Sequence, residues 1–180
     1  MGIVTKDFKE IFSAEILSTT GGLVAGLLLA LYVDKIYLIP GIFILLPGFL
    51  EMRGNISGSI SARLSSGLFL GALKPKIRKN RILRGNIVAS IILVIIISLL
   101  LGVIAYLVSF FVFGLSFPSI ILIALLAGIL SNIIEIPLTV VTTFWLFKRG
   151  HDPNNIMGPY VTTTGDIISI ISLLAAVTLI

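Results

Sequence analysis

Carboxylate, amide and hydroxyl side chains recur at helical spacing inside apolar segments of this 180-residue chain. Glu51 and Asn55 are four residues apart and Ser59 follows at the next such step, so the three share one helical face. Arg53 and Arg63 lie off that stripe. A charge within an apolar helix is costly and indicates a functional site. The alternative for Glu51 is an ion pair, with Arg53 or across helices, that only locks helices together.

A second polar set lies between positions 131 and 143. Asn132 and Glu135 precede Pro137, which leaves a helical carbonyl without its partner. Thr139 and Thr142 fall on the same face as Glu135. Hydroxyl groups alone also serve as contacts between helices, and for the threonines we favour this interpretation.

The third set is the most informative, because it contains the sole acid of the last apolar segment. Asp166 lies 13 residues after Pro153, about 20 Å along a helix that enters from the cytoplasm and thus near the bilayer midplane. Thr162 and Thr163 precede it, and Asn155 lies nearer the start of the segment. The alternative is a neutral aspartic acid that is hydrogen-bonded to hydroxyls.

These oxygen donors are hard ligands, and the chain contains no cysteine and one histidine. The inventory favours Mg²⁺, Ca²⁺ or Mn²⁺ over softer metals. Because carboxylates are few and Mg²⁺ gives up its water reluctantly, a largely hydrated Mg²⁺ fits best, as a transported ion. The candidate ligands are Glu51, Asn55, Asn132, Glu135, Asn155, Thr162, Thr163 and Asp166. No HExxH, GxSxG or paired-aspartate motif is present, so we do not expect an enzyme.

The elements that carry these residues are predicted to be transmembrane helices. The chain is 57% hydrophobic and 12% charged, which no soluble domain of this size could bury. Each apolar segment is long enough to cross about 30 Å of hydrocarbon. The sequence predicts an all-α membrane protein with five spans, at roughly Ile16–Val33, Ile42–Leu73, Gly85–Val108, Pro118–Phe147 and Pro153–Ile180. The second contains charges and glycines, so we expect it to face protein or water.

The loop charges predict the orientation. Basic residues cluster at 74–84 and at 148–149, whereas the connection at 110–116 is uncharged. The positive-inside rule then places the N-terminus in the cytoplasm and the C-terminus outside the cytoplasmic membrane. This distribution accounts for the formal charge of +5, and we expect no nucleic-acid partner. We expect residues 1–15 to form a cytoplasmic amphipathic segment or a frayed tail, followed by a membrane domain at 16–180.

Two stretches resemble a known family. PG at 47–48 with RGNISGSISARLSSG at 53–67, and DPNNIMGPYVTTTGD at 152–166, are similar to the signature stretches of the MgtE family of magnesium transporters and their eukaryotic solute-carrier relatives. The resemblance implies a dimer with the ion path at its axis, lined by the second and fifth helices. It also implies that Asp166 is the main cation ligand, with Asn155, Gly158, Thr162, Thr163 and the pair Gly54-Asn55 nearby.

The expected function is therefore divalent cation transport, most simply of Mg²⁺, by a homodimer in the lipid bilayer. The bacterial members carry a large cytoplasmic sensing domain, which the roughly 15 residues before the first span could not form. The eukaryotic relatives join two five-helix units, and a homodimer would restore that number. The alternatives are transport of Co²⁺ or Mn²⁺, exchange with Na⁺ or H⁺, or a partner subunit that does not itself transport.

Overall fold

The computed structural model describes residues 2–77 and 80–180, with side chains from Thr5 onward. Within these residues every regular element is an α-helix, which confirms the all-α prediction. A short helix, α2 (Val33–Tyr37), turns the chain between α1 and α3. The long helices are α1 (Gly2–Leu31), α3 (Ile42–Phe69), α4 (Arg81–Phe113), α5 (Ser119–Lys148) and α6 (Pro153–Leu179).

Local signals in the sequence set the helix ends. The side chains of Asn80 and Asp152 accept hydrogen bonds from backbone N–H groups in the first turns of α4 and α6, at 3.0 and 2.8 Å. Pro153 occupies the first turn of α6, where no donor is lost. After α4 and α5 the chain turns at Gly114 and Gly150, whose φ values of 67° and 77° suit glycine.

The helix bounds differ from the predicted segments chiefly at the ends of α1 and α4. Helix α4 begins four residues before Gly85 and ends five residues after Val108. Helix α3 ends four residues before Leu73, so the connection between the two helices is displaced and not shortened. Helix α1 runs without a break from Gly2 to Leu31, so residues 2–15 continue into the first apolar segment as one helix, and residue 1 lies outside the described residues. Its place at a membrane surface stays a prediction.

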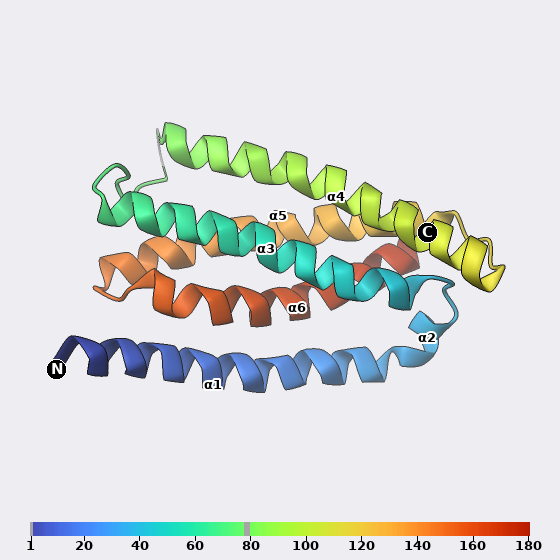
Figure 1. Ribbon diagram of the computed structural model, residues 1–180, viewed down its shortest axis with the longest axis horizontal. Coiled ribbons are helices and arrows are strands. Elements are labelled where there is room, and N and C mark those ends of the chain that lie inside the picture. Colours follow the sequence, from blue (N-terminus) through green and yellow to red (C-terminus); the bar gives the residue numbers. More distant parts are fainter. Residues whose placement is uncertain (1, 78–79) are drawn as a thin grey trace.

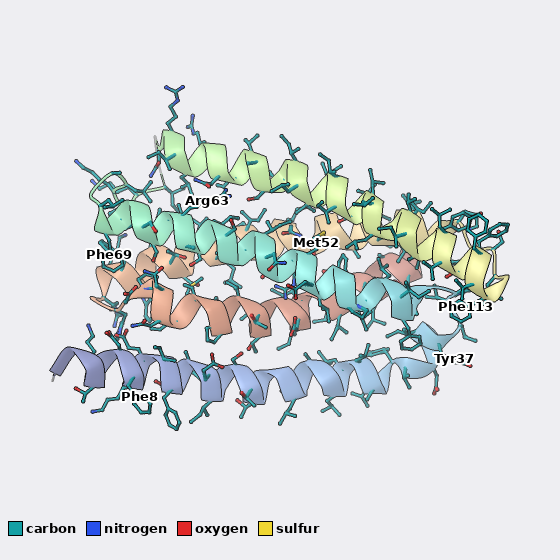
Figure 2. All side chains as sticks on the ribbon, viewed as in Figure 1. Phe8, Tyr37, Met52, Arg63, Phe69 and Phe113 are labelled. Atoms are coloured by element: carbon teal, nitrogen blue, oxygen red, sulfur yellow. The ribbon has the colours of Figure 1, made fainter. Side chains whose placement is uncertain are left out.

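The helices form a bundle along one long axis, with the two chain ends at opposite ends of that axis (Figure 1). Helix α5 packs against α4, α6 and α3, and α3 also packs against α4 and α6. Helix α1 lies at the edge and contacts mainly α6. In Figure 2, Phe8 of α1 and Phe113 of α4 lie at the periphery, while Met52 of α3 lies inside.

Small residues allow α4 and α5 to approach closely. A Cβ at Gly102 would lie 2.8 Å from the Cα of Ile121, and a Cβ at Gly128 would overlap Ser98. Close contact of this kind drives helix association where lipid removes the hydrophobic effect. Large apolar side chains, many of them on α4, remain exposed on the outside of the bundle, as expected for lipid-facing helices.

Four helices, α1, α4, α5 and α6, are long and apolar enough to cross a membrane, so the chain is a multi-pass membrane protein. Helix α3 is not among them. Its 28 residues would reach about 42 Å, but Glu51, Arg53 and Arg63 lower its apolar character. It packs against three other helices, as its polar content predicts. Five spans and their orientation stay predictions.

Candidate cation site

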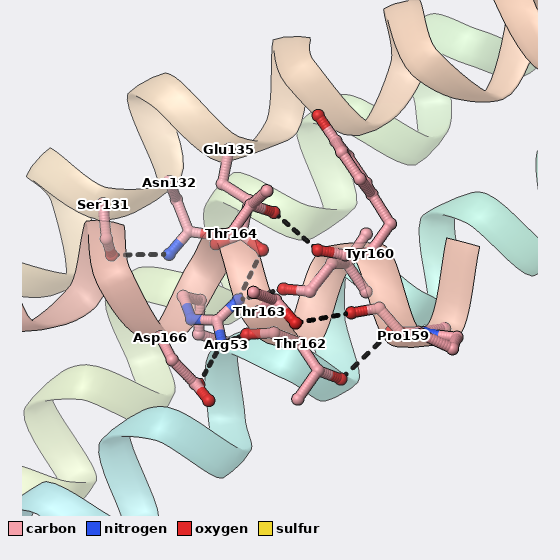
Figure 3. A network of polar contacts seen from close by, with 12 residues as sticks. Arg53, Ser131, Asn132, Glu135, Pro159, Tyr160, Thr162, Thr163, Thr164 and Asp166 are labelled. Atoms are coloured by element: carbon pink, nitrogen blue, oxygen red, sulfur yellow. Dashed lines mark hydrogen bonds and ion pairs between the residues drawn. The ribbon is translucent and has the colours of Figure 1, made fainter. Parts of the chain in front are cut away.

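A buried guanidinium joins three helices near their midpoints. Arg53 of α3 is fully buried, and its Nη1 donates to Oε1 of Glu135 on α5 and, at 3.0 Å, to the carbonyl of Val161 on α6. Its Nη2 donates to Oδ1 of Asp166 at 2.9 Å and to the carbonyl of Thr162 at 3.4 Å. Figure 3 shows Arg53 between the two acids, which lie on different helices.

The two acids differ in their access to solvent. The Glu135 side chain is 1% exposed, whereas the Asp166 side chain is 27% exposed. Removing one member of a buried ion pair leaves an uncompensated charge and typically costs about 3–5 kcal/mol. Arg53 and Glu135 therefore hold the bundle together, while Asp166, the central residue of α6, can also meet a ligand.

Gly165 provides the space for Arg53 on α6. A Cβ at this position would overlap the Nη1 and Cζ atoms of the guanidinium. Any other residue at 165 would therefore displace Arg53 or push α6 away from α3. In the Thr-Gly-Asp sequence at 164–166, the acid therefore directly follows the glycine whose missing side chain leaves room for the guanidinium.

A groove of about 410 Å³ opens beside this ion pair, between α3 and α6. Asp166 and Thr162 line it from α6, while Glu51 and Asn55 line it from α3. The Asn55 amide donates to Oε1 of Glu51 at 3.0 Å, and both residues are exposed. The i,i+4 relation inferred for this pair is confirmed. Asn55, which the family resemblance places near Asp166, lines the same groove, and Glu51 joins it there.

Thr163 points away from the groove. It donates to the Ser18 carbonyl on α1 at 3.1 Å and is 2.7 Å from the Ser18 hydroxyl. Successive helical residues diverge by about 100°, so Thr162 and Thr163 lie on either side of Asp166 and turn to different neighbours. Thr162 therefore lines the groove with Asp166, whereas Thr163 does not, and a role of Thr163 as an ion ligand stays a prediction.

Asn155 lies far from the groove, at the end of the bundle that holds the N-terminus. Its amide donates to Asp7 at 3.2 Å and to Glu10 at 3.1 Å, both on α1. Since 11 residues of helix separate it from Asp166, the two are about 16 Å apart along α6. Asn155 joins α1 to α6 and does not share a site with Asp166.

Asn132 also lies outside the groove. It is buried on α5, where its amide donates to the Gly128 carbonyl at 2.9 Å, and it borders an apolar pocket between α4 and α5. Glu135 lies one turn further along α5, but its side chain reaches Arg53 and does not line the groove. Of the eight predicted ligands, the groove brings together Glu51, Asn55, Thr162 and Asp166.

Across the described residues no three His, Asp or Glu side chains gather as a metal cage. The groove offers two carboxylates, one amide and one hydroxyl, a set that suits an ion that keeps part of its water.

Arg53 was not among the predicted site residues, because it lies off the helical face of Glu51. In the structure it is the residue that joins the two acids. The cost of a charge in an apolar helix, which singled out Asp166, applies equally to Arg53.

An all-helical multi-pass membrane protein with acids facing a groove at mid-helix has the features of an ion transporter. The model of the MgtE family, described as a divalent cation transporter, matches residues 46–176. That range covers most of the chain, from the first turns of α3 to near the end of α6, so the chain belongs to the MgtE family.

Curated relatives agree with the family assignment. The chain is 27% identical over 137 residues to Solute carrier family 41 member 2 of Gallus gallus, covering 72% of this chain and 23% of that protein. The human protein of the same name is 26% identical over the same length, with the same coverage. This chain therefore spans less than a quarter of each relative. No solved structure matches it at a significant level.

We expect Gly165→Ala to destabilise the protein, because its methyl group would occupy the space of the guanidinium. Overpacking typically costs about 1–3 kcal/mol, which corresponds to a melting temperature lower by about 5 °C for a chain of this size. Fluorescence of the single tryptophan in detergent would report the transition. Gly158→Ala on the same helix is the control, since no atom lies near its added methyl group. Equal stability of the two variants would contradict the assigned role.

Proposed function

We propose that this chain transports a divalent cation, with Mg²⁺ as the first candidate, across the cytoplasmic membrane through a path at the axis of a homodimer. The observation that carries the proposal is the groove that Asp166 lines from α6 and Glu51 lines from α3. Membership of a divalent cation transporter family supports the same function. We propose Asp166, Glu51, Asn55 and Thr162 as the residues that meet the ion.

The dimensions and donors of the groove favour a hydrated ion. Mg²⁺ with six waters, at roughly 30 Å³ each, needs about 180 Å³, and the groove provides about 410 Å³. Two carboxylates and an amide can hold such an ion through its water shell. Co²⁺ and Mn²⁺ are the alternative cargoes, and exchange with Na⁺ or H⁺ is the alternative mechanism.

The proposed topology has five spans, with α3 as the fifth and the N-terminus in the cytoplasm. The two chain ends lie at opposite ends of the bundle, as an odd number of crossings requires (Figure 1). Lys6 donates to the Gly150 carbonyl at 2.7 Å, so the start of α1 lies beside the basic loop that follows α5. Positive charge at one end supports a cytoplasmic location for that end.

A second copy of the chain would complete the site. Glu51 and Asn55 are exposed on one face of the bundle, where contact with lipid would be costly. Pairing this face with its counterpart across a two-fold axis would enclose the polar groups between two copies of α3 and α6. The ion path would then have acids on both sides.

Purified protein in liposomes should conduct Mg²⁺, and Asp166→Asn should abolish the flux. The substitution keeps the size of the side chain but removes the negative charge that faces the groove. Fluorescent ion indicators inside the liposomes, with gradients of Mg²⁺, Mn²⁺, Co²⁺, Ca²⁺ and Na⁺, would measure rate and preference. Asp34→Asn is the matched control, because Asp34 is exposed on α2 and remote from the groove. Normal flux in Asp166→Asn would refute the site, and no flux of any ion would refute the function.

The topology can be tested with single cysteines, because the chain has none of its own. Lys76→Cys and Leu115→Cys lie in the connections that the proposal places on opposite sides of the membrane. A maleimide that cannot cross membranes should label only Leu115→Cys in intact cells and both variants in permeabilised cells. Labelling of Lys76→Cys in intact cells would contradict the orientation.

In lipid nanodiscs the protein should have the mass of two chains. Native mass spectrometry of the nanodisc sample would measure it, with flux measured on the same preparation. A monomer that transports at the full rate would rule out a shared path at a dimer axis.

A further inference from the structure

Asp166, the acid that faces the groove, is already paired with a positively charged side chain of the same chain, Arg53. Its Oδ1 accepts a hydrogen bond from Nη2 of Arg53 at 2.9 Å, in an ion pair whose arginine is fully buried. A cation that binds Asp166 must therefore compete with the guanidinium. The competitor belongs to the same chain and is present at a fixed, high effective concentration.

Arg53 has a second acid to which it can turn. Its Nη1 is already held by Glu135 and by the Val161 carbonyl. Glu135 Oε2 and Arg53 Nε are both buried, and in the described part of the chain neither atom has a hydrogen-bond partner. An arginine and a carboxylate can form two parallel hydrogen bonds, so Glu135 can accept the donor that leaves Asp166. The guanidinium would keep a charged partner throughout this movement.

We propose that Arg53 is an internal competitor for the cation at Asp166. It pairs with both acids while the groove is empty and turns to Glu135 alone when a divalent cation binds. This inference rests on the proposed function, and it assigns Glu135 as the positioning residue that receives Arg53. Asp166 alone is then the acid of this trio that meets the ion.

The competition favours divalent ions over monovalent ones. A dication is attracted to a carboxylate twice as strongly as a guanidinium or Na⁺ at the same distance and dielectric constant. It can therefore displace Arg53, whereas Na⁺ exchanges one single charge for another and gains little. When ionised, Glu51, Glu135 and Asp166 together with Arg53 carry a formal charge of −2, which one divalent cation balances.

The test is Mg²⁺ binding to the purified dimer in nanodiscs, measured by calorimetry for two variants with opposite expectations. Glu135→Gln weakens the alternative position of Arg53, so the arginine stays on Asp166 and Mg²⁺ should bind about tenfold more weakly. Arg53→Met combined with Glu135→Gln removes the competitor and leaves no buried charge unpaired. That double variant should bind Mg²⁺ about tenfold more tightly, and Na⁺ should then compete with Mg²⁺ more effectively.

Arg63→Met is the matched control, because Arg63 is exposed on the same helix and contacts only Asn86 among the described residues. It should bind Mg²⁺ like the unaltered protein. If both Glu135 variants bind Mg²⁺ more weakly, or neither changes, Arg53 has only a structural role and the inference fails while the proposed function stands. If neither the unaltered protein nor the double variant binds Mg²⁺ or any other divalent cation, the proposed function fails with it.

Discussion

The burial of the Arg53 guanidinium is the constraint from which the arrangement of the bundle follows. A charge at mid-helix cannot face lipid, so α3 must lie among other helices. Its compensation comes from Glu135 on α5 and Asp166 on α6, which fixes the rotation of both helices about their axes. Gly165 then becomes a requirement, because the guanidinium lies directly against the α6 backbone. The same packing places Asp166 at the contact between α3 and α6, where it pairs with Arg53 and lines the groove.

Helix α6 also carries the contacts that hold α1. Near the middle of α6, Thr163 donates a hydrogen bond to the Ser18 carbonyl on α1. In the first turn of α6, the Asn155 amide donates a hydrogen bond to Glu10 on α1. His151, just before α6, lies 2.9 Å from the same carboxylate of Glu10. Since α1 is otherwise little buried, these polar contacts determine where it lies. They also support α6 on the side opposite the groove, so α1 contributes indirectly to the position of Asp166.

Composition and motif were sufficient to predict the helical membrane class and the family resemblance, and both are confirmed. Helical spacing was also sufficient to pair Glu51 with Asn55, because that relation lies within one helix. The partners of Arg53 could not be predicted in this way. They lie 82 and 113 positions away in the sequence, and which faces meet depends on the packing of three helices at once. Nothing within α3 identifies those faces.

The separation of Asn155 from Asp166 was predictable, because three turns of helix lie between them. The contact of Thr163 with α1 was not, since Thr163 lies three residues before Asp166 and its neighbour depends on how the helices pack. The motif suggested one site because its residues are adjacent in sequence. Along a helix, however, adjacency directs side chains to different neighbours, here α1 and the groove. A motif in a membrane helix therefore specifies several contacts of that helix at once.

The unequal exposure of the two acids explains why a transporter would keep an arginine beside the carboxylate that its ion needs. A charged side chain at mid-membrane is costly when it has no partner of opposite charge. Arg53 supplies the opposite charge to Asp166, and Glu135, whose side chain is 1% exposed, holds Arg53 in place from α5. In the site that we propose, this pairing compensates Asp166 before a cation arrives, and it is also the interaction that the cation would have to break.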